Sequence, residues 1–174
     1  RTDVADCIDA TKEVLRRGLV DPDRIAIRGS SAGGLTVLNT LATSRIFAAG
    51  TSLYGVTDLR ALAAETHKFE SRYTDRLIAP WPEGEAVYLE RSPLSLADRI
   101  KAPVLFLQGL EDKVVPPSQA QTMSEILRRN GNIAPLHEFP GEGHGFRSAE
   151  TLKQAMILEL EFYGKVFGFQ PNFS

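Results

Sequence analysis

Residues 24–34 read RIAIRGSSAGG, an apolar run that leads into a G-x-S-x-G turn and then into a helical pattern. A sharp turn between a strand and a helix brings neighbouring backbone segments close together, so we expect a β-carbon at Gly29 or Gly33 to collide. Such a turn lifts the hydroxyl of Ser31 above the sheet. It also leaves the first N–H groups of the helix unpaired, where they can stabilise an oxyanion. The stretch therefore indicates a nucleophilic serine.

Other interpretations of these glycines fit less well. A phosphate-binding loop requires G-x-x-x-x-G-K-[ST], but no lysine follows Gly34, and a dinucleotide fingerprint requires G-x-G-x-x-G. From this motif alone, a glycine turn that begins a helix and has no catalytic role remains an alternative interpretation. The motif needs an acid and a histidine further along the chain.

Two later strands end in loops that carry such partners. The continuous apolar run at 103–108 leads to Asp112, and the strand expected at 134–139 leads to His144, which glycines flank. Strand ends are where chemistry gathers in parallel sheets. The order serine, acid, histidine is that of the α/β-hydrolases, so the three residues predict a catalytic triad with Ser31.

Competing candidates exist for two of the three roles. Glu111 lies beside Asp112 and could serve as the acid, since triads accept either carboxylate. His67 falls in a helical stretch and His137 alternates within a strand, so we interpret both as structural or surface groups.

The pattern of the whole chain predicts one partial α/β domain, residues 1–174. We expect strands and helices to alternate, which gives a parallel sheet with right-handed crossovers. The expected strands lie near 24–30, 46–53, 103–108 and 134–139, and the expected helices near 32–43, 117–130 and 148–166. An insert at 57–98, with Trp81 between two prolines, is expected to form the wall of a pocket.

Four segments resemble the catalytic domain of the prolyl oligopeptidase family of serine peptidases, which includes dipeptidyl-peptidases and acylaminoacyl-peptidases. They are residues 21–34, residues 69–73, the G-x-x-D-x-x-V-P of 109–116 and the G-E-G-H-G-F of 141–146. The resemblance implies an α/β-hydrolase fold of about eight strands. The four strands expected here would be the last four, so the N-terminal strands would be missing.

The resemblance also implies a role for each residue of the site. Ser31 would be the nucleophile, His144 the general base, and Asp112 the group that orients the imidazole and stabilises its charged form. Ala32 would supply one N–H of the oxyanion hole. The implied substrate-binding residues form a pocket for an apolar or small side chain: Val56, Phe69, Tyr73 and Val115. Without the resemblance, Phe69 and Tyr73 would equally suit an i, i+4 aromatic contact packed on a core.

Three positions differ from the dipeptidyl-peptidase branch of the family. Ala32 and Val114 stand where that branch has a tyrosine and an asparagine, and Phe69 stands where it has a tyrosine. We therefore expect an oligopeptidase or acylaminoacyl-peptidase that cleaves oligopeptides through an acyl-enzyme, without a cofactor or metal. A carboxylesterase on the same fold, and a catalytically silent fragment that acts through association, are the alternatives.

Composition sets limits on partners and location. The chain has 174 residues, a net charge of −2 and a single cysteine, Cys7. This charge gives no reason to expect binding to nucleic acid or to a membrane, and one cysteine excludes a disulfide framework or a multi-cysteine metal site. No apolar run reaches the length of a membrane span and no signal peptide opens the chain. We expect a cytoplasmic protein.

The expected strand at 24–30 would be an edge of the sheet. Its unpaired backbone groups predict association, either with a second copy or with the missing N-terminal half. The second oxyanion donor of the fold comes from a loop in that half. Because one such donor contributes about 10²–10³ in rate, we expect the isolated fragment to be weakly active or inactive.

Overall fold

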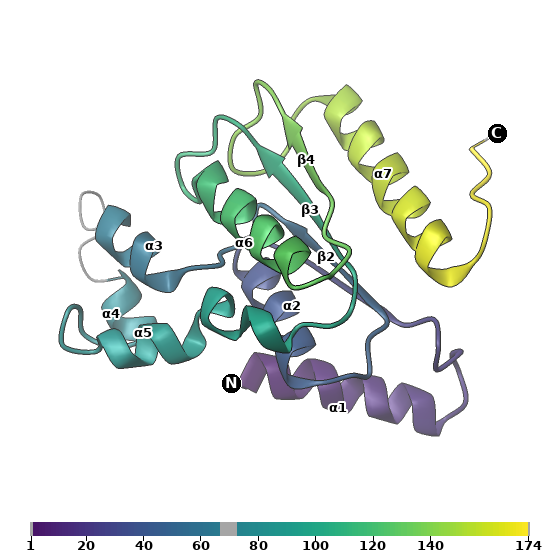
Figure 1. The fold of residues 1–174 in the computed structure, drawn as a ribbon, viewed down its shortest axis with the longest axis horizontal. Coiled ribbons are helices and arrows are strands. Elements are labelled where there is room, and N and C mark those ends of the chain that lie inside the picture. The colour runs from purple at the N-terminus through teal and green to yellow at the C-terminus, as the bar shows by residue number, and fades with distance from the viewer. Residues whose placement is uncertain (1, 67–72, 174) are drawn as a thin grey trace.

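The computed structural model describes residues 2–66 and 73–173 (Figure 1). Strands and helices alternate along most of the chain, as the sequence predicts. The elements are α1 (Thr2–Arg16), β1 (Ala26–Ser30), α2 (Ala32–Thr43), β2 (Ala49–Leu53), α3 (Leu59–Thr66), α4 (Tyr73–Leu77), α5 (Glu85–Arg91), a 3₁₀ helix η1 (Pro93–Arg99), β3 (Val104–Gly109), α6 (Pro117–Arg129), β4 (Leu136–Phe139) and α7 (Ala149–Phe167).

The four strands form one parallel sheet in the order β1-β2-β3-β4. Ala26 pairs with Ala49 at the start of the first two strands, and Gly109 pairs with Phe139 at the end of the last two. Each strand lies within about three residues of its expected bounds. Because all strands run the same way, their carboxyl ends share one edge of the sheet, and the loops that follow them lie close together.

Helices cover both faces of the sheet. Figure 1 shows α7 on the opposite side of the strands from α2 and α6. In β3, Val104 and Phe106 belong to the core cluster that includes residues of α2 and α6, while Leu105 and Leu107 belong to the cluster with α7. Successive side chains of a strand point to opposite faces. A strand buried on both faces is therefore an almost continuous apolar run, as at 103–107 before Gln108.

The insert between β2 and β3 is helical and packs on the end of the sheet through a third, smaller core. This cluster joins residues of the insert to Val115 in the loop after β3. Trp81 packs edge-on against Tyr88, whose ring is fully buried and whose hydroxyl donates to the carbonyl of Ala79 at 2.8 Å. The insert thus lies against the loop that carries Asp112.

Candidate active site

The chain turns sharply between β1 and α2, and Ser31 occupies the turn. Its backbone has φ 54° and ψ −118°, a strained conformation for a residue with a β-carbon. The neighbouring strand holds it there, because the N–H of Ser31 donates to the carbonyl of Leu53 at 2.9 Å. On the helix side of the turn, the carbonyl of Ser31 accepts a hydrogen bond from the N–H of Gly34 in α2 at 3.0 Å. The strain is therefore supported from both sides of the turn.

Two glycines make this turn possible, but they are not the two that the motif predicts. A β-carbon on Gly29 would collide with the carbonyl of Gly33, as expected. A β-carbon on Gly33 would meet nothing within 4 Å, so the prediction for that position is wrong. The close approach lies one residue later, where a β-carbon on Gly34 would come within 2.6 Å of the Cα of Gly55. In the first turn of α2, it is position 34 that faces the loop after β2.

Three side chains from distant parts of the sequence form a continuous chain of hydrogen bonds. His144 Nε2 lies 2.8 Å from Ser31 Oγ, and His144 Nδ1 lies 2.8 Å from Asp112 Oδ2. The side chain of Asp112 is fully buried, whereas that of His144 keeps 23% of its surface exposed. The partly exposed imidazole, next to the half-buried Ser31, is thus the part of this chain of hydrogen bonds that a ligand could reach.

The contacts of Asp112 assign the tautomer of His144. Its Oδ1 accepts the N–H groups of Val114 and Val115 at 2.9 and 2.8 Å, and its Oδ2 accepts from Gln108 at 3.3 Å. Since every neighbour is a donor, the carboxylate acts only as an acceptor, and Nδ1 of the imidazole carries the proton. In the neutral ring, Nε2 is then free to accept the proton of the Ser31 hydroxyl.

The two loops that carry Asp112 and His144 are locked to each other. The N–H of Glu111 donates to the carbonyl of Glu142 at 2.9 Å. The carboxylate of Glu142 is buried and accepts the N–H groups of Arg147 and Ser148 at 2.8 and 3.0 Å, just before α7. The hydrogen bond from Arg147 is the main cause that holds the pKa of Glu142 below its ordinary value. Glu142 thus ties the histidine loop to the start of α7.

An aromatic row supports the imidazole from the α7 side. The ring of Tyr54 meets His144 edge-on with centroids 5.1 Å apart, and meets Phe146 in the same way at 5.2 Å. Phe146 in turn packs on Phe139 at the end of β4. Tyr54 has a φ of 38°, which is rare for a bulky residue. Neither its conformation nor its contact with His144 has a signal in the sequence.

The remaining predicted positions fall in different surroundings. Ala32 is the first residue of α2, so its N–H has no acceptor within the helix. Val56 and Val115 lie in one cluster with 5% and 1% of their surface exposed, so little of either is open to a ligand. Phe69 lies outside the described residues. Tyr73 is the first residue of α4, and its side chain also lies outside what the structure describes. Their part in substrate binding stays a prediction.

The structure also bears on the competing candidates for the acid and the histidine. Glu111 is exposed and meets the histidine loop through its backbone, whereas the neighbouring Asp112 holds the imidazole. His137 lies in β4, as expected from its alternation, and His67 lies outside the described residues. Of the two adjacent carboxylates, only that of Asp112 has a hydrogen bond to His144 in this structure.

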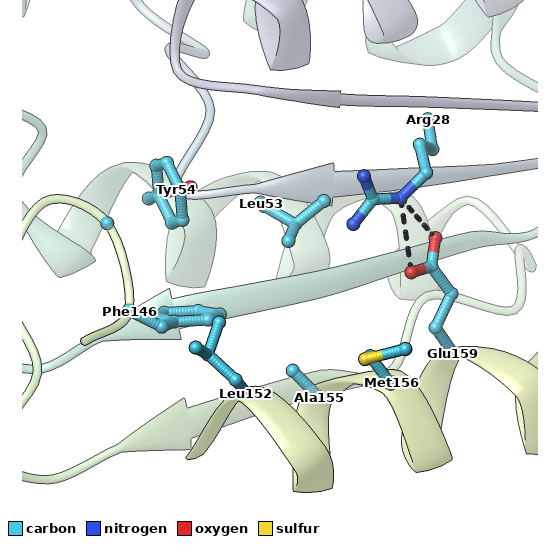
Figure 2. Close-up of a pocket in the computed structure, with 9 residues that line it drawn as sticks. Arg28, Leu53, Tyr54, Phe146, Leu152, Ala155, Met156 and Glu159 are labelled. Atoms are coloured by element: carbon cyan, nitrogen blue, oxygen red, sulfur yellow. Dashed lines mark hydrogen bonds and ion pairs between the residues drawn. The ribbon is translucent and has the colours of Figure 1, made fainter. Parts of the chain in front are cut away.

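A cavity of about 180 Å³ lies between the sheet and α7 (Figure 2). Tyr54 and Phe146 line one end, and Arg28 pairs with Glu159 at 3.0 Å at the other. None of the predicted site residues whose side chains the structure describes lines it. Within residues 2–66 and 73–173, no cluster of three or more His, Cys, Asp or Glu side chains could hold a metal ion. The described helices include none that is long and apolar enough to cross a membrane.

Comparison with known proteins places this geometry in a family. A puromycin-hydrolyzing peptidase of Mycobacterium tuberculosis is 46% identical, with a TM-score of 0.93 over 98% of this chain and 26% of that chain. An acylaminoacyl peptidase of Pyrococcus horikoshii is 26% identical, with a TM-score of 0.85 over 98% of this chain and 29% of that chain. Dipeptidyl aminopeptidase BIII of Pseudoxanthomonas mexicana is 30% identical over 94% of this chain and 24% of its own length.

The chain therefore spans about a quarter of the length of these relatives. They are peptidases by name, and the solved ones share the arrangement of four parallel strands between helices described above. The α/β-hydrolase fold expected from the sequence is confirmed. The model of the prolyl oligopeptidase family matches residues 1–170, and the chain belongs to that family.

Proposed function

We propose that the protein is a serine peptidase that hydrolyses peptide bonds of oligopeptides through an acyl-enzyme on Ser31. The observation that carries this proposal is the pair of 2.8 Å hydrogen bonds that link Ser31 to His144 and His144 to Asp112. A hydroxyl at its ordinary pKa is a weak nucleophile, and an adjacent base with its own orienting group is the arrangement that activates it.

The first half of the reaction forms the acyl-enzyme. Ser31 Oγ attacks the carbonyl carbon of the substrate while His144 Nε2 takes the hydroxyl proton. Asp112 stabilises the imidazolium that results. The carbonyl oxygen becomes an oxyanion, and we propose the N–H of Ala32, at the start of α2, as one donor that binds it. The C–N bond then breaks as the imidazolium gives its proton to the leaving amine.

The second half releases the product and restores the enzyme. Water attacks the ester carbonyl as His144 takes one of its protons, and the C–O bond to Ser31 breaks as the proton returns to Oγ. Apart from the substrate and one water molecule, the proposed cycle uses side chains and backbone groups of the protein. Because a protonated imidazole cannot accept the serine proton, we expect activity to be lost at acidic pH.

The substrate class is proposed from the family and from the predicted pocket. The family resemblance implies a pocket for an apolar or small side chain before the scissile bond; of its described members, Val56 and Val115 are apolar but buried, so they lie behind the surface that a ligand would contact. The relative that is 46% identical is named for hydrolysing puromycin, an aminoacyl amide. We therefore propose short peptides and aminoacyl amides with an apolar residue, including N-acylated ones, as the substrates of this protein.

The test compares matched amides and esters on the protein in its full length. We expect turnover of aminoacyl p-nitroanilides and of puromycin, and its loss in Ser31→Ala with the fold retained by circular dichroism. Turnover of p-nitrophenyl esters alone would replace the peptidase with a carboxylesterase. Failure of a fluorophosphonate to label Ser31 in a folded protein would contradict both and favour the catalytically silent alternative.

We also propose that the 174-residue chain associates through β1 when it is produced alone. Among the described residues β1 pairs only with β2, so one side of this strand presents backbone N–H and C=O groups without a strand partner. Sedimentation velocity should then show dimers or larger species. A monomer at every concentration would contradict the proposal.

A further inference from the structure

A buried amide lies directly beneath Asp112. Gln108 is the penultimate residue of β3, its side chain is among the largest that are fully buried, and its Nε2 lies 3.3 Å from Asp112 Oδ2. We propose that Gln108 is a positioning residue that holds the carboxylate of Asp112 in the orientation that His144 requires.

The surroundings fix which way the amide of Gln108 points. Its nitrogen has three acceptors within reach: the carbonyl of Gly109 at 3.1 Å, the carbonyl of Val115 at 3.3 Å and the carboxylate of Asp112. Turning the amide over would place its oxygen against three oxygens, one of them charged. The NH₂ group must therefore face Asp112.

This orientation has a cost on the other side of the amide. The Oε1 of Gln108 is buried and has no donor among residues 2–66 and 73–173. An unpaired buried acceptor lowers stability, and an apolar residue of the same shape would avoid the loss. Such local conflicts concentrate at functional sites. The contact with Asp112 is the feature of this position that an apolar side chain could not supply.

The two oxygens of Asp112 are held by different parts of the fold. Oδ1 accepts from the backbone of Val114 and Val115, which belong to the same loop as Asp112 itself. Oδ2 accepts from His144 and from Gln108. Gln108 is therefore the donor that ties the catalytic oxygen to the sheet, where β3 pairs on both sides.

The same amide also steadies the loop that supplies the other donors. The carbonyl of Val115 accepts from Gln108, and the N–H of Val115 donates to Asp112 Oδ1. Gln108, Asp112 and Val115 thus close a ring of hydrogen bonds across the base of the loop. Loss of the Gln108 amide would leave Oδ2 with His144 as its one hydrogen-bond partner among the described residues, and the carboxylate would be freer to rotate.

The inference rests on the proposed function, and Gln108→Met tests it. Methionine keeps the length and volume of the side chain and removes the donor. We expect the rate of fluorophosphonate labelling of Ser31, and kcat on a peptide substrate, to fall on the order of tenfold to a hundredfold with KM little changed. The uncompensated charge on Oδ2 attracts the imidazole proton more strongly. The acidic limb of the labelling rate should therefore move to higher pH.

Gln119→Met is the matched control. Gln119 is also buried, and its amide holds the backbone of Thr57 and Asp58 rather than the acid. We expect Gln119→Met to lower the melting temperature without moving the acidic limb. A merely structural role for Gln108 predicts the same behaviour in both variants, so the pH profile separates the two roles.

Three outcomes decide the matter. Folded Gln108→Met protein with a labelling rate within twofold of wild type and an unmoved limb would overturn the positioning role. If that variant does not fold, Gln108→Glu keeps the shape and sets a second carboxyl against Asp112, and the same criterion applies to it. A folded wild-type protein in which Ser31 is not labelled would overturn the proposed function, and this inference with it.

Discussion

Gly109 and Glu142 touch backbone to backbone where the acid loop leaves β3. A β-carbon on Gly109 would collide with the carbonyl of Glu142 and come within 2.6 Å of the carbonyl of Gly143. These carbonyls belong to a loop that closes on His144, so the contact sets the separation between the acid and the base. A larger residue at position 109 would force the two loops apart.

We therefore expect Gly109→Ala to reduce both stability and activity. The overpacking should cost about 1–3 kcal/mol of unfolding free energy, since the colliding atoms are backbone and cannot move aside easily. Labelling of Ser31 by a fluorophosphonate in the folded fraction should slow by roughly tenfold or more, because a 1 Å misplacement in an active site has effects of this order. Urea unfolding and a labelling time course measure the two effects, and wild-type values in either would contradict the contact.

The lowered pKa of Glu142 predicts a dependence of stability on pH. A carboxyl whose pKa is lower in the folded state stabilises the fold above its ordinary value of 4.5, and this contribution is lost as pH falls through the lowered value. We expect Glu142→Gln to lower the melting temperature at pH 7, because the amide can accept through only one of the two oxygen positions. The difference in melting temperature between wild type and Glu142→Gln should become smaller as the pH is reduced below about 4.5.

Glu150→Gln provides the control for this prediction. Glu150 is exposed in the first turn of α7, a few residues after Glu142. Its substitution removes the same charge close to the same helix end, so the general effect on the helix dipole is matched. If both variants lost the same melting temperature relative to wild type, or if the loss in Glu142→Gln did not change with pH, the role of Glu142 would be contradicted.

Alanine substitutions of the two motif glycines, Gly29 and Gly33, should change the stability of the fold in opposite directions. Gly29→Ala meets the carbonyl of Gly33 and should destabilise the fold by about 1–3 kcal/mol. Gly33→Ala meets nothing within 4 Å and lies in α2, where alanine is favoured over glycine by about 0.5–1 kcal/mol. Thermal unfolding of the pair should therefore shift in opposite directions, and a large loss in Gly33→Ala would restore the motif-based expectation.

Tyr54 should affect catalysis by His144 through the packing of its ring and not through charge. Tyr54→Ala removes the ring that packs on His144 and Phe146, and we expect kcat to fall roughly threefold to tenfold, the range that one aromatic contact represents. Tyr54→Phe keeps the ring and should stay close to wild type. If Tyr54→Phe lost as much activity as Tyr54→Ala, the hydroxyl rather than the packing would be responsible.

The sequence predicts the sheet and the order of the site residues well, for a definite reason. Strands buried on both faces are apolar along nearly all of their length, as 103–107 is, and residues placed after parallel strands meet at one edge. These two rules are enough to bring Ser31, Asp112 and His144 to the same place. They depend only on local composition and on chain order, which a sequence displays directly.

The supporting contacts escape such rules because they depend on approach through space. The choice between Gly33 and Gly34 depends on the rotation of α2 against the loop after β2, which no spacing encodes. Tyr54 adopts a positive φ that its residue type disfavours, so propensity points the wrong way. Gln108 sits in an apolar strand, where a lone amide has no pattern to mark it, and only its position under Asp112 explains it.

The distance along the chain between Ser31 and His144 has a consequence for biosynthesis. The two residues are 113 positions apart, and Asp112 lies 32 before His144, so the site depends on contacts that close long loops. Such contacts form late, because their entropy cost precedes their reward. A nascent chain that has emerged only as far as β3 lacks the base altogether. The hydrogen-bonded arrangement of Ser31, His144 and Asp112 therefore cannot form during synthesis until the loop after β4 has been made and β4 has joined the sheet.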